Sequence, residues 1–325
     1  MNEAIRYSII IPVYNEEAVI HETHRRLTQV MESLAEPYEL LFVNDGSQDR
    51  TEEIITELKE ADPHVKLLDF SRNFGHQIAI TAGMDHALGD AIVIIDADLQ
   101  DPPELIPQMI EKWKEGYEVV YAKRSKRKGE TLFKKWTAAL FYRTLRALTE
   151  VNIPLDTGDF RLIDRKVAEA MKGIREKNRF VRGLVSWVGF RQTAIEYVRD
   201  ERFAGETKYP LKKMLRFSMD GITSFSYKPL KLATYLGFFI SFASFLYLLV
   251  SLGERLFTTS TVAGWTSLIA CVLLLNGVIL IILGILGEYV GRIYDETKNR
   301  PLYILRNRPN VEQRKQQEVK QGVRP

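Results

Sequence analysis

The chain has 325 residues, of which 46% are hydrophobic and 27% are charged, and its 45 Lys and Arg against 42 Asp and Glu leave a net charge of +3. That length is sufficient for one large or two ordinary domains with a proper core. The single cysteine, Cys271, excludes an intramolecular disulfide, and we expect no nucleic-acid partner.

Between residues 7 and 125 the chain alternates apolar runs with helical stretches. The expected strands are 7–13, 38–43, 65–70, 91–95 and 118–122, and the expected helices are 16–34, 51–61, 75–88 and 103–115. Apolar strands separated by helices of this length indicate a parallel sheet covered on both faces. The sequence therefore predicts an α/β domain, whose ligands bind beyond the carboxyl ends of the strands.

Polar residues follow four of these strands, in the segments PVYNEE, VNDGSQD, SRNFGHQ and DADLQDPPE. Four polar ends at one edge favour a binding site, although Ser47 to Asp49 can partly cap a helix. The first segment lacks the glycines of a dinucleotide-binding turn, which makes an NAD-type site improbable. No G-x-x-x-x-G-K-[ST] sequence occurs, which excludes a P-loop nucleotidase.

Three carboxylates crowd the end of the fourth strand, at Asp96, Asp98 and Asp101. They repel one another, so a fold that keeps them together needs a compensating positive charge. Clustered oxygen ligands suit Mg²⁺ or Mn²⁺, which commonly sit between carboxylates and substrate phosphates. We expect the strand to turn at its end, so that Asp96 and Asp98 can both approach one cation.

Two stretches near the C-terminal end, about 232–253 and 264–287, carry almost no charge. Each exceeds the roughly 20 residues that cross a bilayer as a helix. The alternative, a buried hairpin of soluble helices, would normally keep a polar face. We expect Asn276, the one strongly polar residue inside, to bond to the partner helix.

Flanking charges predict how these stretches are oriented. Lys228 and Lys231 precede the first, several basic residues follow the second, and the connecting loop offers only Arg255 beside Glu254. By the positive-inside rule, both termini are cytoplasmic. The N-terminal apolar run is short and interrupted by proline and acid, unlike a signal peptide. We therefore expect a multi-pass protein of the cell membrane with a large cytoplasmic domain.

Two basic amphipathic stretches, 131–148 and 209–228, are expected to lie on an anionic membrane face. In each, apolar residues recur at helical spacing, and lysine or arginine occupies other positions around the helix. The alternative for each stretch is a helix packed on the sheet.

Five segments resemble the inverting, GT-A-fold glycosyltransferases of family 2: IIIPVYNEE, FVNDGSQDRT, SRNFGHQ, DADLQDPPE and DTGDFRL. Within that family the chain is most similar to the polyprenyl-phosphate glycosyltransferases. The resemblance implies a GT-A, Rossmann-like, mainly parallel sheet domain, then amphipathic interface helices and a two-helix transmembrane hairpin. The expected parts are a catalytic domain at 1–208, a juxtamembrane helix at 209–228, the hairpin at 229–291 and a basic tail at 292–325.

The resemblance also implies roles for individual residues. A nucleotide sugar would be held by Pro12, Tyr14, Glu16, Asp45, Asp96, Arg202 and Lys208. A divalent cation on its diphosphate, Mg²⁺ or Mn²⁺, would be held by Asp96, Asp98 and Gln100. That cation would supply the missing positive charge and stabilise the departing nucleoside diphosphate.

The membrane stretches indicate a lipid acceptor. A polyprenyl phosphate such as undecaprenyl phosphate fits, because its phosphate, with a second pKa of about 6, is already anionic near neutral pH. Such a nucleophile needs positioning more than deprotonation. The expected acceptor-phosphate residues are Arg124, Arg143 and Arg161. The expected catalytic residues are Asp159, Asp156 and Asp98. Either Asp159 or Asp156 would orient the acceptor or act as base, and Asp159 is favoured because Asp156 can be a turn residue.

We therefore expect an inverting hexosyltransferase that uses UDP-glucose or UDP-N-acetylglucosamine, with GDP-mannose as a further candidate. A processive polysaccharide synthase and a non-catalytic, membrane-anchored scaffold that binds sugar nucleotides are the alternatives, and homo-oligomerisation is left open. The region around Arg182 and Trp187 has no Q-x-x-R-W motif, and two spans are too few to enclose a channel, which disfavours the synthase.

Overall fold

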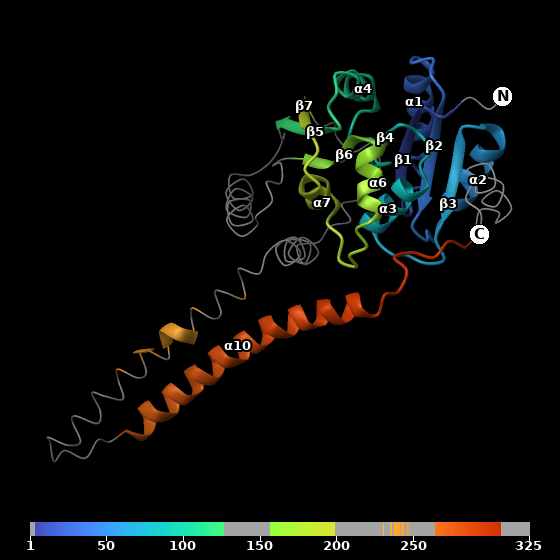
Figure 1. The fold of residues 1–325 in the computed structure, drawn as a ribbon. Coiled ribbons are helices and arrows are strands. Elements are labelled where there is room, and N and C mark those ends of the chain that lie inside the picture. The colour runs from blue at the N-terminus through green and yellow to red at the C-terminus, as the bar shows by residue number, and fades with distance from the viewer. Residues whose placement is uncertain are drawn as a thin grey trace, which may run out of the picture.

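A computed structural model of the chain describes residues 4–126, 157–198 and 264–306, with isolated positions between 230 and 246. The strands are β1 (Tyr7–Val13), β2 (Tyr38–Asn44), β3 (Val65–Asp69), β4 (Ala91–Ile94), β5 (Val119–Lys126), β6 (Thr157–Asp164) and β7 (Gln192–Val198). The helices are α1 (Ile20–Glu32), α2 (Thr51–Ala61), α3 (His76–His86), the short 3-10 helix η1 (Pro103–Leu105), α4 (Ile106–Lys114), α6 (Arg165–Lys172), α7 (Val181–Trp187) and α10 (Trp265–Thr297). Figure 1 shows a sheet domain and α10 reaching away from it.

Within the described residues, seven strands form one sheet in the order β3-β2-β1-β4-β6-β5-β7. The five predicted strands and four predicted helices are confirmed, with ends that differ by a few residues. The first four strands are parallel, but β6 runs antiparallel to both β4 and β5. The sheet is thus mixed and Rossmann-like, and neither β6 nor β7 was predicted.

Helices cover both faces of the sheet, as the apolar strands require. Along β1 the fully buried side chains alternate, with Ile9 and Ile11 on one face and Ile10 on the other. The face of Ile9 packs against α1, α2 and α4, whereas the face of Ile10 packs against α3, α6 and α7. The central strands are therefore inaccessible along their length, and polar chemistry is confined to their ends.

The carboxyl ends of the parallel strands lie level with one another. Val13 pairs with Asn44, and Asn44 pairs with Asp69, so β1, β2 and β3 end at one edge. Because β6 is antiparallel, its first residues reach this same edge. Its Arg161 pairs with Ile94, the last residue of β4, so the residues before Arg161 extend beyond that strand.

Of the helices in the described ranges, only α10 is long and apolar enough to cross a membrane, over Leu275–Thr297, with a mean hydropathy of 1.7. None of its most apolar window is buried by the rest of the described structure. The predicted stretch 264–287 is helical from Trp265, and the helix continues to Thr297. The stretch 232–253 lies largely outside the described residues, and both basic amphipathic stretches lie wholly outside them.

Candidate active site

The acidic segment forms a turn, as the sequence predicts. β4 ends at Ile94, before the carboxylates begin, and Leu99 has a φ of 57°, in the left-handed region. Asp96 and Asp98 are half-buried, whereas Asp101 is fully buried. The turn therefore separates the three carboxylates into different environments at the edge of the sheet.

His76, the first residue of α3, supplies a positive charge to which the sequence analysis assigned no role. Its Nε2 lies 3.2 Å from Oδ2 of Asp159 and 3.5 Å from Oδ1 of Asp96. Burial alone would lower the pKa of His76, but the carboxylates of Asp96 and Asp159 outweigh burial and raise that pKa to about 9. The imidazolium therefore offsets part of the repulsion in the acid cluster near neutral pH.

Asp159, at the start of β6, accepts a bidentate ion pair from α7. Arg182 donates from Nε to Oδ1 at 2.8 Å and from Nη2 to Oδ2 at 3.0 Å. Burial would raise the pKa of Asp159, yet Arg182 and His76 hold that pKa well below its usual range. A carboxylate paired this strongly is a weak proton acceptor. Of the two roles expected for Asp159, this favours orienting the acceptor over acting as base.

Asp101 is held by different partners. The Tyr197 hydroxyl donates a hydrogen bond to Asp101, and Nη2 of Arg124 lies 3.9 Å from Oδ1 of the same carboxylate. A Cβ at Gly158 would lie 2.7 Å from Nη2 of Arg124, so the guanidinium packs closely over this glycine and would have to shift for a larger residue. Arg124 therefore contacts the acid cluster, and a charge change at Arg124 would disturb Asp101 as well as any acceptor phosphate.

Arg161 points its guanidinium at the backbone of its own strand. It is 4% exposed, and it donates to the carbonyl oxygens of Gly158 at 3.0 Å and Asp159 at 3.3 Å. Burial lowers the pKa of Arg161 to about 10, although Asp159 opposes that shift. This placement favours support of the start of β6 over the phosphate contact expected for Arg161.

The loops after β1 and β2 are joined by hydrogen bonds at the same edge. Asn15 donates its backbone N–H to Oγ of Ser47 at 3.0 Å, and Gln48 donates its backbone N–H to Oδ1 of Asn15 at 2.8 Å. The residues expected at the nucleotide on or beside these loops are Pro12, Tyr14, Glu16 and Asp45. Because the nucleotide is predicted to bind here, we refer to the two loops as the nucleotide end of the site.

Asp45 connects this end to the loop after β3. The carboxylate is 3% exposed and accepts backbone N–H bonds from Phe74 at 2.6 Å and from Gly75 at 3.0 and 3.1 Å. Next to it, Gly46 has a φ of 68°, and a Cβ there would lie 2.5 Å from the carbonyl carbon of Arg72. The position of Asp45 therefore depends on how the loop after β3 is held.

The acid turn fits a divalent cation. Oδ1 of Asp96 is buried and accepts no hydrogen bond from any described residue. Burial raises the pKa of Asp96, His76 opposes the rise, and the carboxylates of Asp159 and Asp101 add to it. A cation would relieve this cost. In the described ranges no three His, Cys, Asp or Glu side chains group closely enough to hold an ion, so substrate phosphates would have to complete the coordination.

Four residues expected in the site lie outside the described ranges, so the structure bears on none of them: Arg143, Asp156, Arg202 and Lys208. Conversely, sequence reasoning missed His76 and Arg182 as members of the site. His76 lies in the SRNFGHQ segment that follows β3, which was a usable signal because that strand ends at the same edge. Arg182 had no such signal, since its helix reaches the site only through packing.

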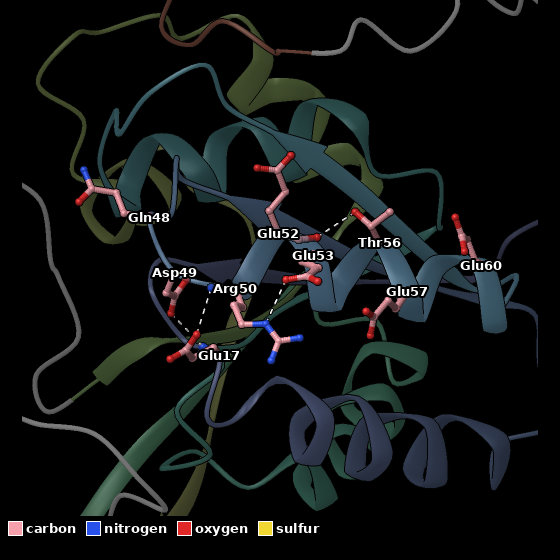
Figure 2. A pocket seen from close by; sticks show the side chains of 9 residues that line it. All are labelled: Glu17, Gln48, Asp49, Arg50, Glu52, Glu53, Thr56, Glu57 and Glu60. Carbon is pink, nitrogen blue, oxygen red and sulfur yellow. Dashed lines mark hydrogen bonds and ion pairs between the residues drawn. The ribbon is translucent and has the colours of Figure 1, made fainter.

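The hollow in Figure 2 lies beside the nucleotide end and has a volume of about 730 Å³. It is lined by Glu17, Gln48, Asp49, Arg50, Glu52, Glu53, Thr56, Glu57 and Glu60. Six carboxylates against one guanidinium disfavour an anionic nucleotide diphosphate. The hollow is therefore a poor match for a nucleotide diphosphate, and the acid turn stays the predicted site.

Comparison with known proteins supports the resemblance to glycosyltransferase family 2. Residues 8–171 match the family model described as Glycosyl transferase family 2. An uncharacterized glycosyltransferase, YkcC, of Bacillus subtilis (strain 168) is 67% identical over 315 residues, 97% of this chain and 98% of that protein. The bactoprenol glucosyl transferase of Shigella phage SfV is 45% identical over 303 residues, 93% of this chain and 99% of that protein. The SfII prophage-derived bactoprenol glucosyl transferase of Shigella flexneri is 45% identical over 302 residues, covering 93% and 98%.

Proposed function

The chain belongs to glycosyl transferase family 2 and is a glycosyltransferase, and from this we propose that it transfers one monosaccharide from a nucleotide sugar to a polyprenyl phosphate. The observation that carries the proposal is the acid turn, where Asp96 keeps a buried oxygen without a hydrogen bond at the ligand-binding edge of the sheet. Similarity over nearly the whole chain to proteins named bactoprenol glucosyl transferase supports a lipid acceptor, and favours glucose over N-acetylglucosamine.

In this mechanism the nucleotide sugar lies along the edge of the sheet, with its nucleoside toward Asp45 and its diphosphate toward the acid turn. Asp96 and Asp98, with Gln100, would hold Mg²⁺ or Mn²⁺, which when bound supplies charge stabilisation to the departing nucleoside diphosphate. His76 keeps Asp96 in place through their 3.5 Å contact. Arg202 and Lys208 are the further residues proposed for phosphate contacts.

The acceptor phosphate oxygen attacks the anomeric carbon. The new carbon–oxygen bond forms as the bond to the diphosphate breaks, and the nucleoside diphosphate leaves with the electron pair. Because the attacking oxygen is already anionic, no general base is required. Asp159 then acts by position, held by Arg182 and His76, and Arg124 and Arg143 are the proposed partners of the acceptor phosphate.

We also propose a two-helix membrane hairpin, with the domain boundaries given by the sequence: catalytic domain 1–208, juxtamembrane helix 209–228, hairpin 229–291 and tail 292–325. Two observations support it. The exposed surface of α10 carries large apolar side chains that no described residue buries, as expected for a helix in lipid. A Cβ at Gly237, in the first expected span, would lie 3.7 Å from Cδ1 of Ile282 on α10.

The central test is transfer of labelled sugar to lipid. Purified full-length protein is incubated with undecaprenyl phosphate, Mg²⁺ or Mn²⁺ and a panel of labelled UDP- and GDP-sugars, and the lipid phase is extracted. We expect one donor, UDP-glucose first among them, to label the lipid through a single phosphate with inverted anomeric configuration. The nucleotide is expected to be released as its diphosphate.

Two results would contradict this function. Polymer formation without labelled lipid would favour the processive synthase, and nucleotide-sugar binding without turnover of any donor would favour the scaffold. Omitting undecaprenyl phosphate is the matched control, because any label that still enters the lipid phase must come from another acceptor.

A reporter fusion tests the proposed orientation. A reporter that is active only in the cytoplasm, fused after Pro325, should be active, because basic residues flank both apolar stretches on that side. The same reporter inserted after Arg255, in the connecting loop, should be inactive. Activity at the loop position together with inactivity at the C-terminal end would reverse the orientation.

A further inference from the structure

After the apolar helix α10, the chain returns to the sheet domain. Residues 302–306, which we call the return segment, lie beside the carboxyl end of β3, the edge strand of the sheet, and Leu305 forms an isolated antiparallel bridge with Phe70. Ser71 donates its N–H to the carbonyl of Ile304 at 2.9 Å, and Arg306 donates its N–H to the carbonyl of Asp69 at 2.8 Å. Figure 1 shows this red segment running from α10 toward β3. It therefore covers the carboxyl end of this edge strand with backbone hydrogen bonds.

Side chains fix the return segment in place. The ring of Tyr303 stacks on Phe70, with centroids 5.3 Å apart and planes inclined by 14°, and its hydroxyl donates to Asp85 at 3.1 Å. Leu302 and Leu305 pack against the hydrophobic core on the α3 face. Buried apolar contacts and directed hydrogen bonds together indicate a docked segment and not a passing loop.

One path of contacts leads from the return segment to the nucleotide end. Nη1 of Arg306 lies 3.2 Å from Oδ2 of Asp69, whose other oxygen accepts a hydrogen bond from Nδ2 of Asn44 at 2.7 Å. Oδ1 of Asn44 in turn accepts bonds from the hydroxyl and the backbone N–H of Ser47, at 2.6 and 3.1 Å. Ser47 is the residue that joins the two nucleotide-end loops by bonding to Asn15.

A second path runs through the backbone. Ser71, which bonds to Ile304, begins the loop after β3, and that loop donates the Phe74 and Gly75 amides to the carboxylate of Asp45. The two paths start at different residues of the return segment and end at Ser47 and Asp45, both in the loop after β2.

We propose that the return segment is a positioning element for the donor: it holds the loop after β3, and with it Asp45, in the geometry that binds the nucleotide. The membrane helix α10 is thereby linked to donor binding through the four residues between Thr297 and Leu302. A contact at the end of α10 supports the link, since Oε1 of Glu296 accepts the backbone N–H of Lys177 at 2.7 Å. The inference rests on the proposed function for the identity of the ligand at Asp45.

The test compares Tyr303→Ala and Arg306→Ala with two controls in the full-length protein. Arg300→Ala removes an exposed positive charge just before the return segment. Ile304→Ala removes a side chain that is 54% exposed and leaves the backbone bond from Ser71. For each protein, hydrogen–deuterium exchange of the peptide that contains residues 71–75 is measured, together with the affinity for UDP in the presence of Mg²⁺ and the KM and kcat for the donor.

We expect Tyr303→Ala to speed exchange at the Phe74 and Gly75 amides and to raise both the Kd for UDP and the KM for the donor. Each change should be about three- to tenfold, which corresponds to the loss of one aromatic pair. Arg306→Ala should change them by about two- to threefold, because its ion pairs are half exposed. The kcat of both variants should stay within about twofold, since the acid turn is untouched. Both controls should match the wild type.

If Tyr303→Ala fails to fold, Arg306→Ala alone decides. Unchanged exchange in peptide 71–75 would overturn the positioning role, and so would a fall in kcat with unchanged KM. A loss of thermal stability with no change in exchange or in KM would overturn it as well. Absence of UDP binding by the wild type would count against the proposed donor and not against this inference, which the exchange measurement then decides by itself.

Discussion

Asp98→Asn is expected to lower the rate of sugar transfer to lipid by about 10²–10³-fold while the protein remains folded. The change removes one negative charge from the pair that would hold the divalent cation, and an amide oxygen binds such an ion more weakly than a carboxylate. Asp98 is half-buried in a turn, where its Oδ1 accepts the Gln100 N–H at 3.2 Å, and asparagine has the same size and keeps an acceptor oxygen for this bond. Initial rates should be measured at saturating donor, undecaprenyl phosphate and cation.

Asp90→Asn is the matched control. Asp90 immediately precedes β4 at the opposite end of the same strand, and it pairs with Arg6 on the surface. The same chemical change there should leave the transfer rate within about twofold, since a surface ion pair contributes little. Near-wild-type transfer by Asp98→Asn at saturating Mg²⁺ and Mn²⁺ would contradict the metal assignment.

Arg182→Met is expected to destabilise the sheet domain by about 2–3 kcal/mol and to abolish most transfer. The Asp159 side chain is 6% exposed, and without Arg182 its carboxylate would be left with the side chains of His76 and Gln77 among the described residues. This value is smaller than the roughly 3–5 kcal/mol expected for a fully buried pair, because the Arg182 side chain is itself 25% exposed. Unfolding in denaturant, followed by tryptophan fluorescence of the full-length protein, gives the change in stability.

The double variant Asp159→Asn with Arg182→Met separates support of the fold from support of the reaction. Removing both charges should recover much of the lost stability, because no unpaired carboxylate is left buried. The transfer rate should stay low, because the acceptor would have lost the group that positions it. Recovery of both stability and transfer would show that the pair only stabilises the fold. Arg25→Met, which breaks an exposed pair with Glu22 within α1, should change neither measurement.

The positive charge needed by the acid cluster could be predicted only in part from the sequence. Three acids within six positions predicted a compensating positive charge, and their oxygen ligands, together with the resemblance to family 2, predicted that a divalent metal supplies it. The structure adds a second compensating charge from the protein itself, because His76 lies between Asp96 and Asp159. His76 stands 20 residues from Asp96 along the chain, so no local pattern connects the two.

The sequence by itself determined the first five strands, the four helices between them, the edge at which the polar segments meet and the turn at Asp96. These features depend on local regularities, namely side-chain periodicity, strand length and the run of polar residues that ends each strand. Family resemblance then identified the reaction class from the same segments.

Only the tertiary structure decided the rest of the site and its connection to α10. β6 runs antiparallel to β4, so its first residues, which include Asp159, lie at the shared edge. α7 packs so that Arg182 reaches the carboxylate of Asp159. The return segment docks at the carboxyl end of β3 across more than 200 residues of chain, through backbone bonds and the stacking of Tyr303 on Phe70. Such contacts depend on strand direction, register and packing between distant elements, and these are properties of the assembled core that the local sequence does not encode.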